Sequence, residues 1–452
     1  MEEDLRKEFE QLMQLLETGE LSAFKEKAAD LAPVDIAEGL EEIADEGRVR
    51  LFFRMLPKDI SSDVFAYMTS EQQQLIAESA TSAELRELMD DMFMDDRVDF
   101  LEEMPANVVK KVLQNTDENT RALINQFLNY PENSAGSLMT IEYVDLRDHF
   151  TVRKALDYIR RTGIDKETIY TCYVVDEARR LVGQVSLRKL IIAQESSLVR
   201  DIMEEDPVCA LTTDDQEAVA DDFRRYDLTS IAVCDKEHRL VGIITVDDIV
   251  DVIQEENTED IKKMAAIIPS DEEYMKTSVF SLVAHRLPWL LLLMISATFT
   301  STIITHFESL LSSAVVLTAF IPMLMDSAGN SGSQTSVTVI RNMALGEVEL
   351  SDWLRVLIKE IGVALVSGLA LALVNLARML LFSKVSLLVA ATVSVTLMCT
   401  VVIAMIVGCL LPMGAKRLGF DPAVMASPMI TTIVDACSLL IYFMIATAIM
   451  GL

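Results

Sequence analysis

The stretch Pro322-Met-Leu-Met-Asp326-Ser-Ala-Gly329-Asn330-Ser-Gly332-Ser333-Gln334-Thr-Ser-Val-Thr-Val-Ile-Arg341 interrupts the apolar second half of this chain with polar groups. Hydrocarbon offers no water to such groups, so each unpaired one costs roughly several kcal/mol there. A carboxylate, glycines, amides and hydroxyls must therefore line a protein–protein contact or a water-filled pathway. A water-filled pathway would make the second half of the chain a transport domain.

Charge separates the chain into two unlike halves. The 452 residues carry 39 basic and 70 acidic side chains and a net charge of -31. From Arg286 onward eight basic and eight acidic residues cancel, which leaves 31 basic and 62 acidic residues on 1–285. Nucleic acid and anionic lipid are poor partners for such a surface, whereas cations are good ones. The alternative, a solubilising acidic surface, stays open for most individual carboxylates.

Several absences narrow the functional class. The six cysteines show no CxxC spacing, and we expect reduced packing residues without a disulfide framework or a zinc site. The start Met1-Glu-Glu-Asp lacks the basic and apolar regions of a signal peptide, so the first half is expected to stay in the cytosol. No nucleophile–base pair, Gly-rich phosphate loop or metalloprotease motif occurs, and we expect no enzymatic activity.

Residues 1–130 read as helices only. Short segments such as Leu56-Pro57-Lys-Asp59-Ile and Met104-Pro105-Ala-Asn-Val108 begin with a proline signal and continue apolar at helical spacing. Recurring helical hairpins predict an acidic, all-α superhelical domain. Such a domain indicates an interaction surface and not chemistry by itself.

Residues 131–253 contain an internal repeat. The sequence Arg180-Leu-Val-Gly183 recurs as Arg239-Leu-Val-Gly242, and a helix, a strand, this turn, a second strand and a closing helix follow one another around each copy. The repeat resembles a pair of CBS modules, at about 137–199 and 200–253, which implies an α/β pair that often binds adenine nucleotides. A purely structural dimerising module is the alternative.

The second copy carries the nucleotide signature of such modules. A glycine, a Ser/Thr three residues on and an Asp six residues on are met by Gly242, Thr245 and Asp248. The first copy departs from it, because Lys189 stands where the carboxylate is needed. The resemblance therefore implies possible ATP binding with one good ribose-binding acid.

An acidic connecting helix is predicted over 246–283, ahead of the membrane. Like charges four residues apart cost roughly 0.2–0.5 kcal/mol per pair on a helix, so a continuous stripe favours neutralisation by a cation. A solvated face is the alternative. The stripe and its neighbours are Asp247, Asp248, Asp251, Glu255, Glu256, Glu259 and Asp260.

Five membrane spans are predicted within a transmembrane domain at 284–452. Each segment exceeds the ~20 residues that cross a bilayer. With the first half in the cytosol, the basic residues of the loops follow the positive-inside bias, and the odd count places the C-terminus outside a cell membrane. The segments are 287–306, 312–340, 361–382, 385–413 and 422–452.

Two acids lie inside these spans. Asp435 is placed near the middle of the last span, where a carboxylate costs about 2.5–3.5 kcal/mol and is a functional candidate by default. A protonated acid between helices is the alternative. Asp326 is a second candidate, although Asn330 and neighbouring hydroxyls could satisfy it locally. Together with Gly329 and Gln334 they form an oxygen-rich set that suits hydrated Mg2+ and argues against zinc, copper or nickel.

The whole chain resembles the MgtE family of magnesium channels. The most specific matches are Gly329-Asn330-Ser-Gly332-Ser333-Gln334, Asp421-Pro422-Ala423, and Asp435 followed by Leu439-Leu-Ile-Tyr442. The resemblance implies a homodimer in the lipid bilayer, with a pore at the subunit interface where Asp435 binds hydrated Mg2+.

The resemblance also implies closure by cytosolic Mg2+ bound between the helical domain, the CBS pair and the connecting, or plug, helix. The matching acids are Asp95, Asp96, Glu217, Asp227, Asp248, Asp251, Glu255, Glu256, Glu259, Asp260 and, at the inner mouth, Asp421.

Two other functions remain open. Asp326 stands where some relatives have a small residue, and an extra acid would permit a Na+-coupled carrier of Mg2+ on the same scaffold. A CBS-based sensor, anchored by its membrane part, is a third hypothesis.

Overall fold

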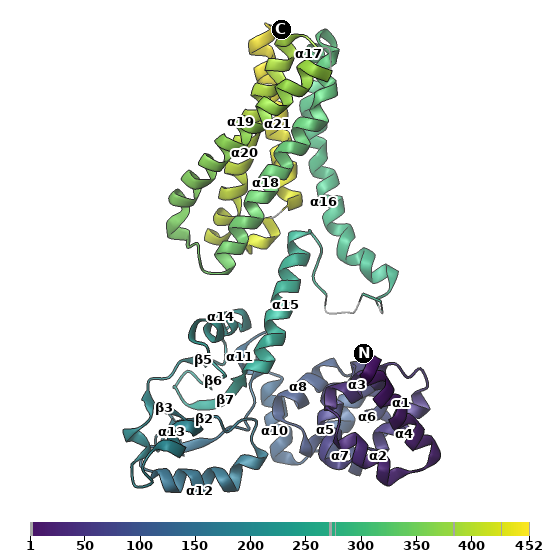
Figure 1. The fold of residues 1–452 in the computed structure, drawn as a ribbon, viewed down its shortest axis with the longest axis vertical. Helices are drawn as coiled ribbons and strands as arrows, with labels where there is room; N and C mark the ends of the chain where they lie inside the picture. Colours follow the sequence, from purple (N-terminus) through teal and green to yellow (C-terminus); the bar gives the residue numbers. More distant parts are fainter. Residues whose placement is uncertain (1–2, 271–273, 276, 383–384, 426, 452) are drawn as a thin grey trace. The chain divides into compact units, whose positions relative to one another are not determined.

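The computed structural model describes residues 1–452 except 1–2, 271–273, 276, 383–384, 426 and 452 (Figure 1). The chain forms two compact units, Met1–Ile253 and Gln254–Leu452. Each unit is described by itself.

The first unit begins with helices only, as predicted for 1–130. Local signals set their ends: Pro33 lies in the first turn of α3, and Thr81 and Glu84 form a reciprocal capping box on α7. The helices are α1 (Glu3–Thr18), α2 (Leu21–Ala29), α3 (Pro33–Glu41), α4 (Glu46–Met55), α5 (Lys58–Ala66), α6 (Ser70–Ser79), α7 (Ser82–Asp91), α8 (Met94–Glu103), α9 (Ala106–Asn115) and α10 (Glu118–Phe127).

Aromatic side chains hold these helices together. Phe52 stacks on Phe9 at 5.3 Å between ring centroids and meets the edge of Phe24 at 5.0 Å. Phe65 and Phe100 make a second edge contact at 5.0 Å, which joins α5 to α8. Such pairs contribute about 0.5–1.5 kcal/mol beyond the area they bury. They fix α8, whose first turn carries two of the predicted metal ligands.

The CBS pair is confirmed as two α/β modules within the first unit. The first contains α11 (Ala135–Leu138), β1 (Asp145–Arg147), α12 (Val152–Thr162), η1 (Gly163–Asp165), β2 (Thr171–Val175), β3 (Leu181–Ser186), α13 (Leu187–Ile192), η2 (Val199–Asp201) and β4 (Glu204–Glu205). The second contains β5 (Cys209–Leu211), α14 (Gln216–Tyr226), β6 (Ser230–Cys234) and β7 (Leu240–Thr245).

The two sheets repeat one topology. Their strand orders are β1-β2-β3-β4 and β5-β6-β7; the first pair in each is parallel and the second antiparallel. The two Arg-Leu-Val-Gly turns meet in an antiparallel bridge between Arg180 and Arg239. The sequence repeat is therefore a structural repeat whose copies face each other at these turns.

Helix α15 (Val246–Met264) is shorter than the predicted connecting segment. It ends before Ala266, whose positive φ of 55° breaks the helical path, and the next helix begins at Val279. Residues 271–273 and 276 of the predicted segment lie outside the described residues. The acidic stripe itself falls entirely on α15.

The second unit continues with long helices. They are α16 (Val279–His306), α17 (Glu308–Ser313), η3 (Val315–Phe320), α18 (Ile321–Ala344), η4 (Leu350–Asp352), α19 (Trp353–Phe382), α20 (Leu387–Arg417), η5 (Pro422–Met425) and α21 (Ser427–Met450). Figure 1 shows α18, α19, α20 and α21 side by side, with α16 along one flank of this bundle.

The predicted second span is not one helix over 312–340. Ala314 leaves helical geometry at φ -139° and ψ 64°, a 3-10 segment follows, and α18 begins only at Ile321 with Pro322 in its first turn. Within the described residues, four helices are long and apolar enough to cross a membrane, namely α16, α19, α20 and α21 with short flanking residues. Helix α18 is not among them, because its polar stretch lowers its hydropathy.

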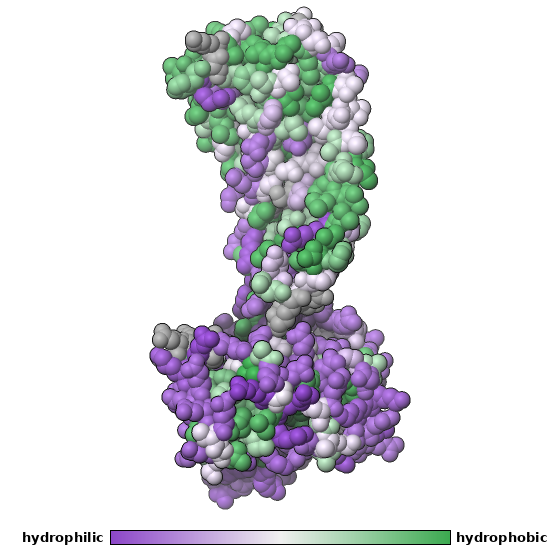
Figure 2. Space-filling model, turned by 90° about the vertical axis from the view of Figure 1, so that its right-hand side faces the viewer, coloured by the Kyte–Doolittle hydropathy of each residue, from purple (hydrophilic) through white to green (hydrophobic). Residues whose placement is uncertain are grey.

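Surface hydropathy separates the two units. Purple hydrophilic residues cover most of the visible face of the first unit in Figure 2, whereas green hydrophobic residues dominate the second. Large apolar side chains such as Phe299 on α16 and Val366 and Val374 on α19 are exposed. A surface of this kind is stable in lipid and not in water.

Candidate ion-binding sites

Glycines bring the backbones of α18 and α20 into contact. A methyl group on Gly408 would collide with the carbonyl of Gly332, and one on Gly332 would lie 3.1 Å from the Ala404 oxygen. Only small residues permit this approach between membrane helices. The glycines of the polar stretch therefore serve packing, on the face of α18 that is turned toward α20 and α21.

An adjacent face of α18 carries a polar stripe that begins next to Gly329. Asp326, Asn330 and Gln334 follow one another at a spacing of four residues, share one face and are all exposed in the single chain. Within the part of the chain that is described, Asp326 and Asn330 form no hydrogen bond with each other. We name Asp326, Asn330 and Gln334 the α18 stripe.

Asp435 lies on α21 beside this helix. A methyl group on Gly329 would be 3.9 Å from Oδ1 of Asp435 and 3.1 Å from Cγ2 of Thr431. Asp326 and Asp435 lie within electrostatic range of each other, and Asp435 is half-buried. The structure thus brings together the two membrane acids that the sequence singled out on separate segments.

A lysine occupies the predicted acidic site that contains Glu259 and Asp421. Nζ of Lys263 lies 2.8 Å from Oε1 of Glu259 and 2.8 Å from Oδ2 of Asp421. Burial alone would lower the pKa of Lys263, but its hydrogen bonds to Asp421 and Glu259 raise it above the ordinary range. Burial and the charge of Asp421 raise the pKa of Asp260 beside them. Sequence reasoning listed these acids without noticing that Lys263 lies between two of them.

A larger group of acids gathers where α8 meets the CBS pair. Oε2 of Glu142 accepts hydrogen bonds from the Met94 amide at 3.4 Å and from Oγ1 of Thr140 at 2.6 Å. Helix α15 brings Asp248, whose Oδ2 accepts from Oγ1 of Thr245 at 2.9 Å. We name this group the acidic cluster; its members are Asp95, Asp96, Glu142, Glu167, Asp247 and Asp248.

These carboxylates disfavour one another's charge. Burial, followed by the charges of Asp248 and other acids, raises the pKa of Asp96 to about 6. Burial, followed by Asp247 and Asp248, raises the pKa of Glu167 to about 7. Burial raises the pKa of Asp248 to about 6 against the opposing hydrogen bond from Thr245, and burial holds that of Asp95 well above its usual range. A cation bound among them would relieve this repulsion.

Within the described residues, Arg97 on α8 forms no ion pair with a carboxylate of the acidic cluster. Arg97 is largely buried and donates its guanidinium hydrogens to the backbone oxygens of Asp90, at 3.0 Å, and Met92. The guanidinium is thus used to hold the turn before α8. The carboxylates of α8 remain available for another cation.

The other predicted ligands are placed differently. Glu217 lies in the first turn of α14, and Asp227 caps the far end of that helix with φ 51°. Both are exposed, and neither is among the main charges that act on Asp96 and Glu167. Asp251 is exposed on α15 and contributes to the raised pKa of Asp248. Glu255 lines a shallow cavity of 260 Å³ with Glu259, and Glu256 is half-buried on the same helix.

The glycine of the nucleotide signature has a packing role of its own. A methyl group on Gly242 would lie 2.6 Å from the Met139 sulfur and 2.8 Å from the Thr140 oxygen. Gly183 of the first module meets Met203 and Glu204 in the same way, at 2.7 Å and 2.8 Å. Both glycines therefore admit a Met-containing segment of the chain, whatever ligand the module binds.

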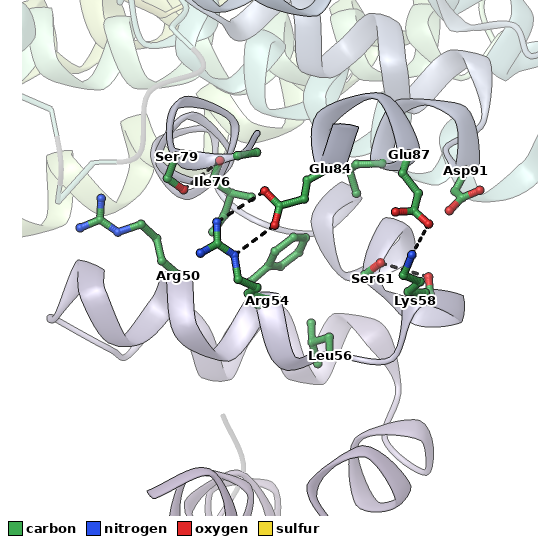
Figure 3. A pocket seen from close by; sticks show the side chains of 13 residues that line it. Arg50, Arg54, Leu56, Lys58, Ser61, Ile76, Ser79, Glu84, Glu87 and Asp91 are labelled. Carbon is green, nitrogen blue, oxygen red and sulfur yellow. Dashed lines mark hydrogen bonds and ion pairs between the residues drawn. The ribbon is translucent and has the colours of Figure 1, made fainter. Parts of the chain in front are cut away.

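A cavity of 260 Å³ in the helical domain is lined by both charge signs (Figure 3). Nε of Arg54 pairs with Oε1 of Glu84 at 3.3 Å, and Lys58 pairs with Glu87. These internal pairs leave little uncompensated charge for a ligand. The cavity contains none of the predicted metal ligands.

Three family models match most of the chain. The MgtE intracellular N domain matches residues 31–133, the CBS domain matches 135–196 and 199–255, and the MgtE divalent cation transporter domain matches 321–445. The magnesium transporter MgtE of Thermus thermophilus is 36% identical over 439 residues, which cover 96% of this chain and 97% of the relative. The chain belongs to the MgtE family. That of Bacillus subtilis is 32% identical, covering 96% of this chain and 95% of the relative.

Two solved structures of soluble parts of magnesium transport proteins resemble about half of this chain. The cytosolic domain of the Mg2+ channel MgtE in complex with ATP is 36% identical, with a TM-score of 0.51 over 53% of this chain and 98% of that one. The soluble part of a magnesium transporter is 29% identical, with a TM-score of 0.53 over 56% and 99%. The MgtE family is one of transporters and not of enzymes, as the sequence indicated.

Sequence reasoning missed several acids of this MgtE chain. Glu142 follows the opening of the first CBS module and Glu167 lies in the loop before β2, so neither shares a helix face with Asp95 or Asp248. Asp99, on the same helix as Asp95, has a pKa raised to about 7, first by desolvation and then by the charge of Asp96. The acidity of each segment was the signal available in the sequence, and it does not state which segments meet.

Proposed function

We propose that this chain is a Mg2+ channel whose ion pathway follows the α18 stripe and Asp435. The observation that carries the proposal is that a carboxylate and two amides lie exposed on a membrane helix next to a second carboxylate. Such groups need water or a partner, and intramembrane acids generally serve ion pathways. Oxygen ligands suit Mg2+, which keeps most of its water and needs only one or two acids. The magnesium transporters among the relatives support the same cargo.

Five spans and a homodimer complete the proposal. Helix α18 has 24 residues and is about 36 Å long, enough for a bilayer core of about 30 Å. It counts as the fifth span because its polar face lowers its hydropathy without shortening it. Two copies of the chain with facing α18 stripes would cover both stripes and enclose a wet pathway. The first unit would then lie in the cytosol and the C-terminus outside.

Closure is assigned to Mg2+ binding at acidic groups on the first unit and on α15. The acidic cluster joins acids from α8, the first CBS module and α15, which repel one another when no cation is bound. A divalent cation stabilises the state in which they lie close together, and it shifts the equilibrium only by its difference in affinity between states. Several weak sites acting together would give a steep response to an abundant ion.

The test is a flux measurement on full-length protein in liposomes, with Mg2+ titrated on the side that carries the first unit. We expect Mg2+ entry at low Mg2+ and a steep fall as Mg2+ rises on that side. The variant Asp96→Asn/Asp248→Asn should need several-fold more Mg2+ for closure. Flux that ignores Mg2+ on this side would remove the gating proposal, and no flux at all would favour a membrane-anchored sensor.

A Na+-coupled carrier is the second candidate, because Asp326 adds a membrane acid beside Asp435. Mg2+ flux that vanishes without a Na+ gradient in the wild type, and becomes independent of Na+ in Asp326→Ala, would favour it. Equal flux with and without Na+ supports the channel.

ATP is proposed to bind the second CBS module through Gly242, Thr245 and Asp248. Support comes from the related cytosolic domain solved in complex with ATP. Asp248 also belongs to the acidic cluster, so ATP and Mg2+ would act on one carboxylate. Equilibrium binding of ATP to wild type and to Asp248→Asn tests this assignment.

Lys263 provides a separate prediction at the inner mouth. Its ammonium already bridges Glu259 and Asp421, so Lys263→Met leaves two carboxylates near each other without a counterion. We expect this variant to close at about tenfold lower Mg2+, which corresponds to about 1.4 kcal/mol of binding free energy. The control is Lys262→Met. It removes a neighbouring ammonium that donates a hydrogen bond to the Ser270 backbone oxygen. Unchanged closure in Lys263→Met would mean that no cation binds at Glu259 and Asp421.

A further inference from the structure

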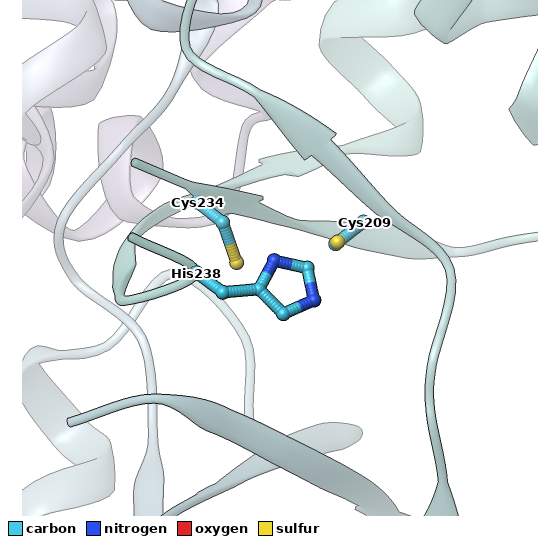
Figure 4. Close-up of side chains that lie close together, drawn as sticks. All are labelled: Cys209, Cys234 and His238. Atoms are coloured by element: carbon cyan, nitrogen blue, oxygen red, sulfur yellow. The ribbon is translucent and has the colours of Figure 1, made fainter. Parts of the chain in front are cut away.

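Two sulfurs and an imidazole gather at the end of the second sheet (Figure 4). The ligand atoms of Cys209, Cys234 and His238 all lie within 4.8 Å of one another. Cys234 is buried, Cys209 is half-buried and His238 is exposed. The group is therefore shielded on one side and open to water on the other.

Strand register explains why these residues meet. On the parallel strands β5 and β6, Cys209 is opposite Ala232 and Leu211 is opposite Cys234. The two cysteines are thus two positions apart in register and share one face of the sheet. No CxxC motif marks them, because 24 residues separate Cys209 from Cys234 in the sequence.

A fixed turn carries the histidine. The carboxylate of Asp235 accepts hydrogen bonds from the amides of Glu237 and Arg239 at 2.8 Å and 2.9 Å. The His238 amide donates to the Asp235 carbonyl at 2.9 Å, and His238 has φ 64°. The imidazole therefore projects from a backbone that is already ordered, as a ligand site requires.

The first CBS module shows that the fold does not demand these residues. Asp145 is opposite Tyr173 just as Cys209 is opposite Ala232, and the strand irregularity at Val175 recurs at Cys234. Arg179 has φ 63° at the turn position that His238 occupies. The same backbone is thus built with Asp, Val and Arg in one copy and with Cys, Cys and His in the other.

We propose that Cys209, Cys234 and His238 form a three-ligand site for a thiophilic cation of the zinc class, with the fourth position open to water. Zn2+ takes thiolates at about 2.3 Å and imidazole at about 2.0–2.1 Å in tetrahedral geometry, which sets ligand atoms about 3.4–3.8 Å apart. The observed cluster needs only small side-chain rotations to reach this spacing. Sulfur ligands select against Mg2+, so this site is independent of the proposed transport sites.

A disulfide is a weaker explanation of the same sulfurs. Diagonal neighbours on paired strands lie roughly 7–8 Å apart at Cα, beyond the usual span of an unstrained disulfide. Both cysteines are free thiols in this structure. The histidine would also have no part in a disulfide.

Metal binding at this site would stabilise the junction of the two CBS modules. The Leu181 amide donates to the His238 carbonyl at 3.1 Å, and the Leu240 amide donates to the Arg179 carbonyl at 3.1 Å. An ion that joins β5, β6 and the His238 turn therefore orders the turn that pairs with the first module. Binding to the folded state alone raises thermal stability as ligand concentration exceeds Kd.

The test uses full-length, reduced protein freed of metal by a chelator. Co2+ is added as a probe, and a thiolate-to-cobalt charge-transfer absorption that one equivalent of Zn2+ per chain abolishes is the expected result. Cys209→Ser and His238→Asn should each weaken Zn2+ binding by about tenfold or more and reduce the Zn2+-induced rise in Tm. Asn tolerates the positive φ at position 238, so this variant is expected to fold.

Cys172→Ala, which removes a buried thiol from β2, and His149→Asn, which removes an exposed imidazole, are the matched controls and should bind Zn2+ like the wild type. The proposal is overturned if the absorption and the Zn2+ stoichiometry persist in Cys209→Ser/His238→Asn. It is equally overturned if the wild type binds no Zn2+ under reducing conditions, or if a Cys209–Cys234 disulfide forms and reduction restores no metal binding.

Discussion

Asp435→Asn is expected to lower Mg2+ flux into liposomes by about a hundredfold. The substitution keeps the shape and hydrogen-bonding capacity of the side chain and removes one negative charge. A divalent ion and a carboxylate separated by one water layer, at about 5 Å, attract by roughly 7 kcal/mol in an effective dielectric of about 20. If hydration offsets about half of this, about 3 kcal/mol remains, which corresponds to the expected factor.

The measurement is Mg2+ entry per folded protein, with two control variants. Asp352→Asn removes a charge from the same unit at a site where Asp352 pairs with Arg355 at 3.1 Å, and it should leave the flux unchanged. Asp435→Glu keeps the charge and should retain part of the flux. Wild-type flux in Asp435→Asn would mean that ions pass elsewhere, and equal loss in Asp435→Glu would indicate a packing role.

Elements with strong local signals were predictable from the sequence. The helices of residues 1–130 begin at proline and capping residues such as Pro33 and Thr81, whose effects do not depend on the rest of the fold. The Arg-Leu-Val-Gly repeat identified two modules, because each module uses the same turn between two of its strands. Hydropathy predicted five spans, and four of them coincide with long apolar helices among the described residues.

Features that depend on contacts between distant segments were not predictable. Nothing local distinguishes Glu142 or Glu167 from the other acids of the first unit; the packing of α8 against the CBS pair selects them. The sequence around Lys263 does not show that its ammonium pairs with Asp421, which lies far along the chain, just before η5. The irregular segment before α18 was also missed, because hydropathy continues across Ala314 where the helix does not.

The stability of the first unit should depend on pH and Mg2+ together. Carboxylates of the acidic cluster have pKa values of about 6 for Asp96 and Asp248 and about 7 for Glu167, against roughly 4 in an unfolded chain. Between about pH 4 and pH 7 the folded state therefore holds protons that the unfolded state releases. Stability contributed by these groups is fully present below about pH 4 and is lost as pH rises through 6 to 7.

Bound Mg2+ should restore the stability that the first unit loses as the pH rises. At pH 7.5 Asp96, Asp248 and Glu167 are largely ionised, and a divalent cation replaces the lost protons, so we expect Mg2+ to raise Tm by several degrees. At pH 5 Asp96, Asp248 and Glu167 are mostly protonated, and the same Mg2+ should have less effect. Thermal unfolding of a fragment of residues 1–264, which contains the first unit and all of α15, measures both.

The double variant Asp96→Asn/Asp248→Asn should distinguish the effect of the acidic cluster on stability from the effect of the other acidic residues of the first unit. With two charges removed, the fall in stability between pH 5 and pH 7.5 becomes smaller and the Mg2+-induced rise in Tm shrinks, since both effects come from the same repulsion. Glu38→Gln removes an exposed charge from α3 and should leave both effects as in the wild type. If the double variant and Glu38→Gln respond alike, Mg2+ acts through the diffuse negative charge of the surface, and the cluster is not the cation site.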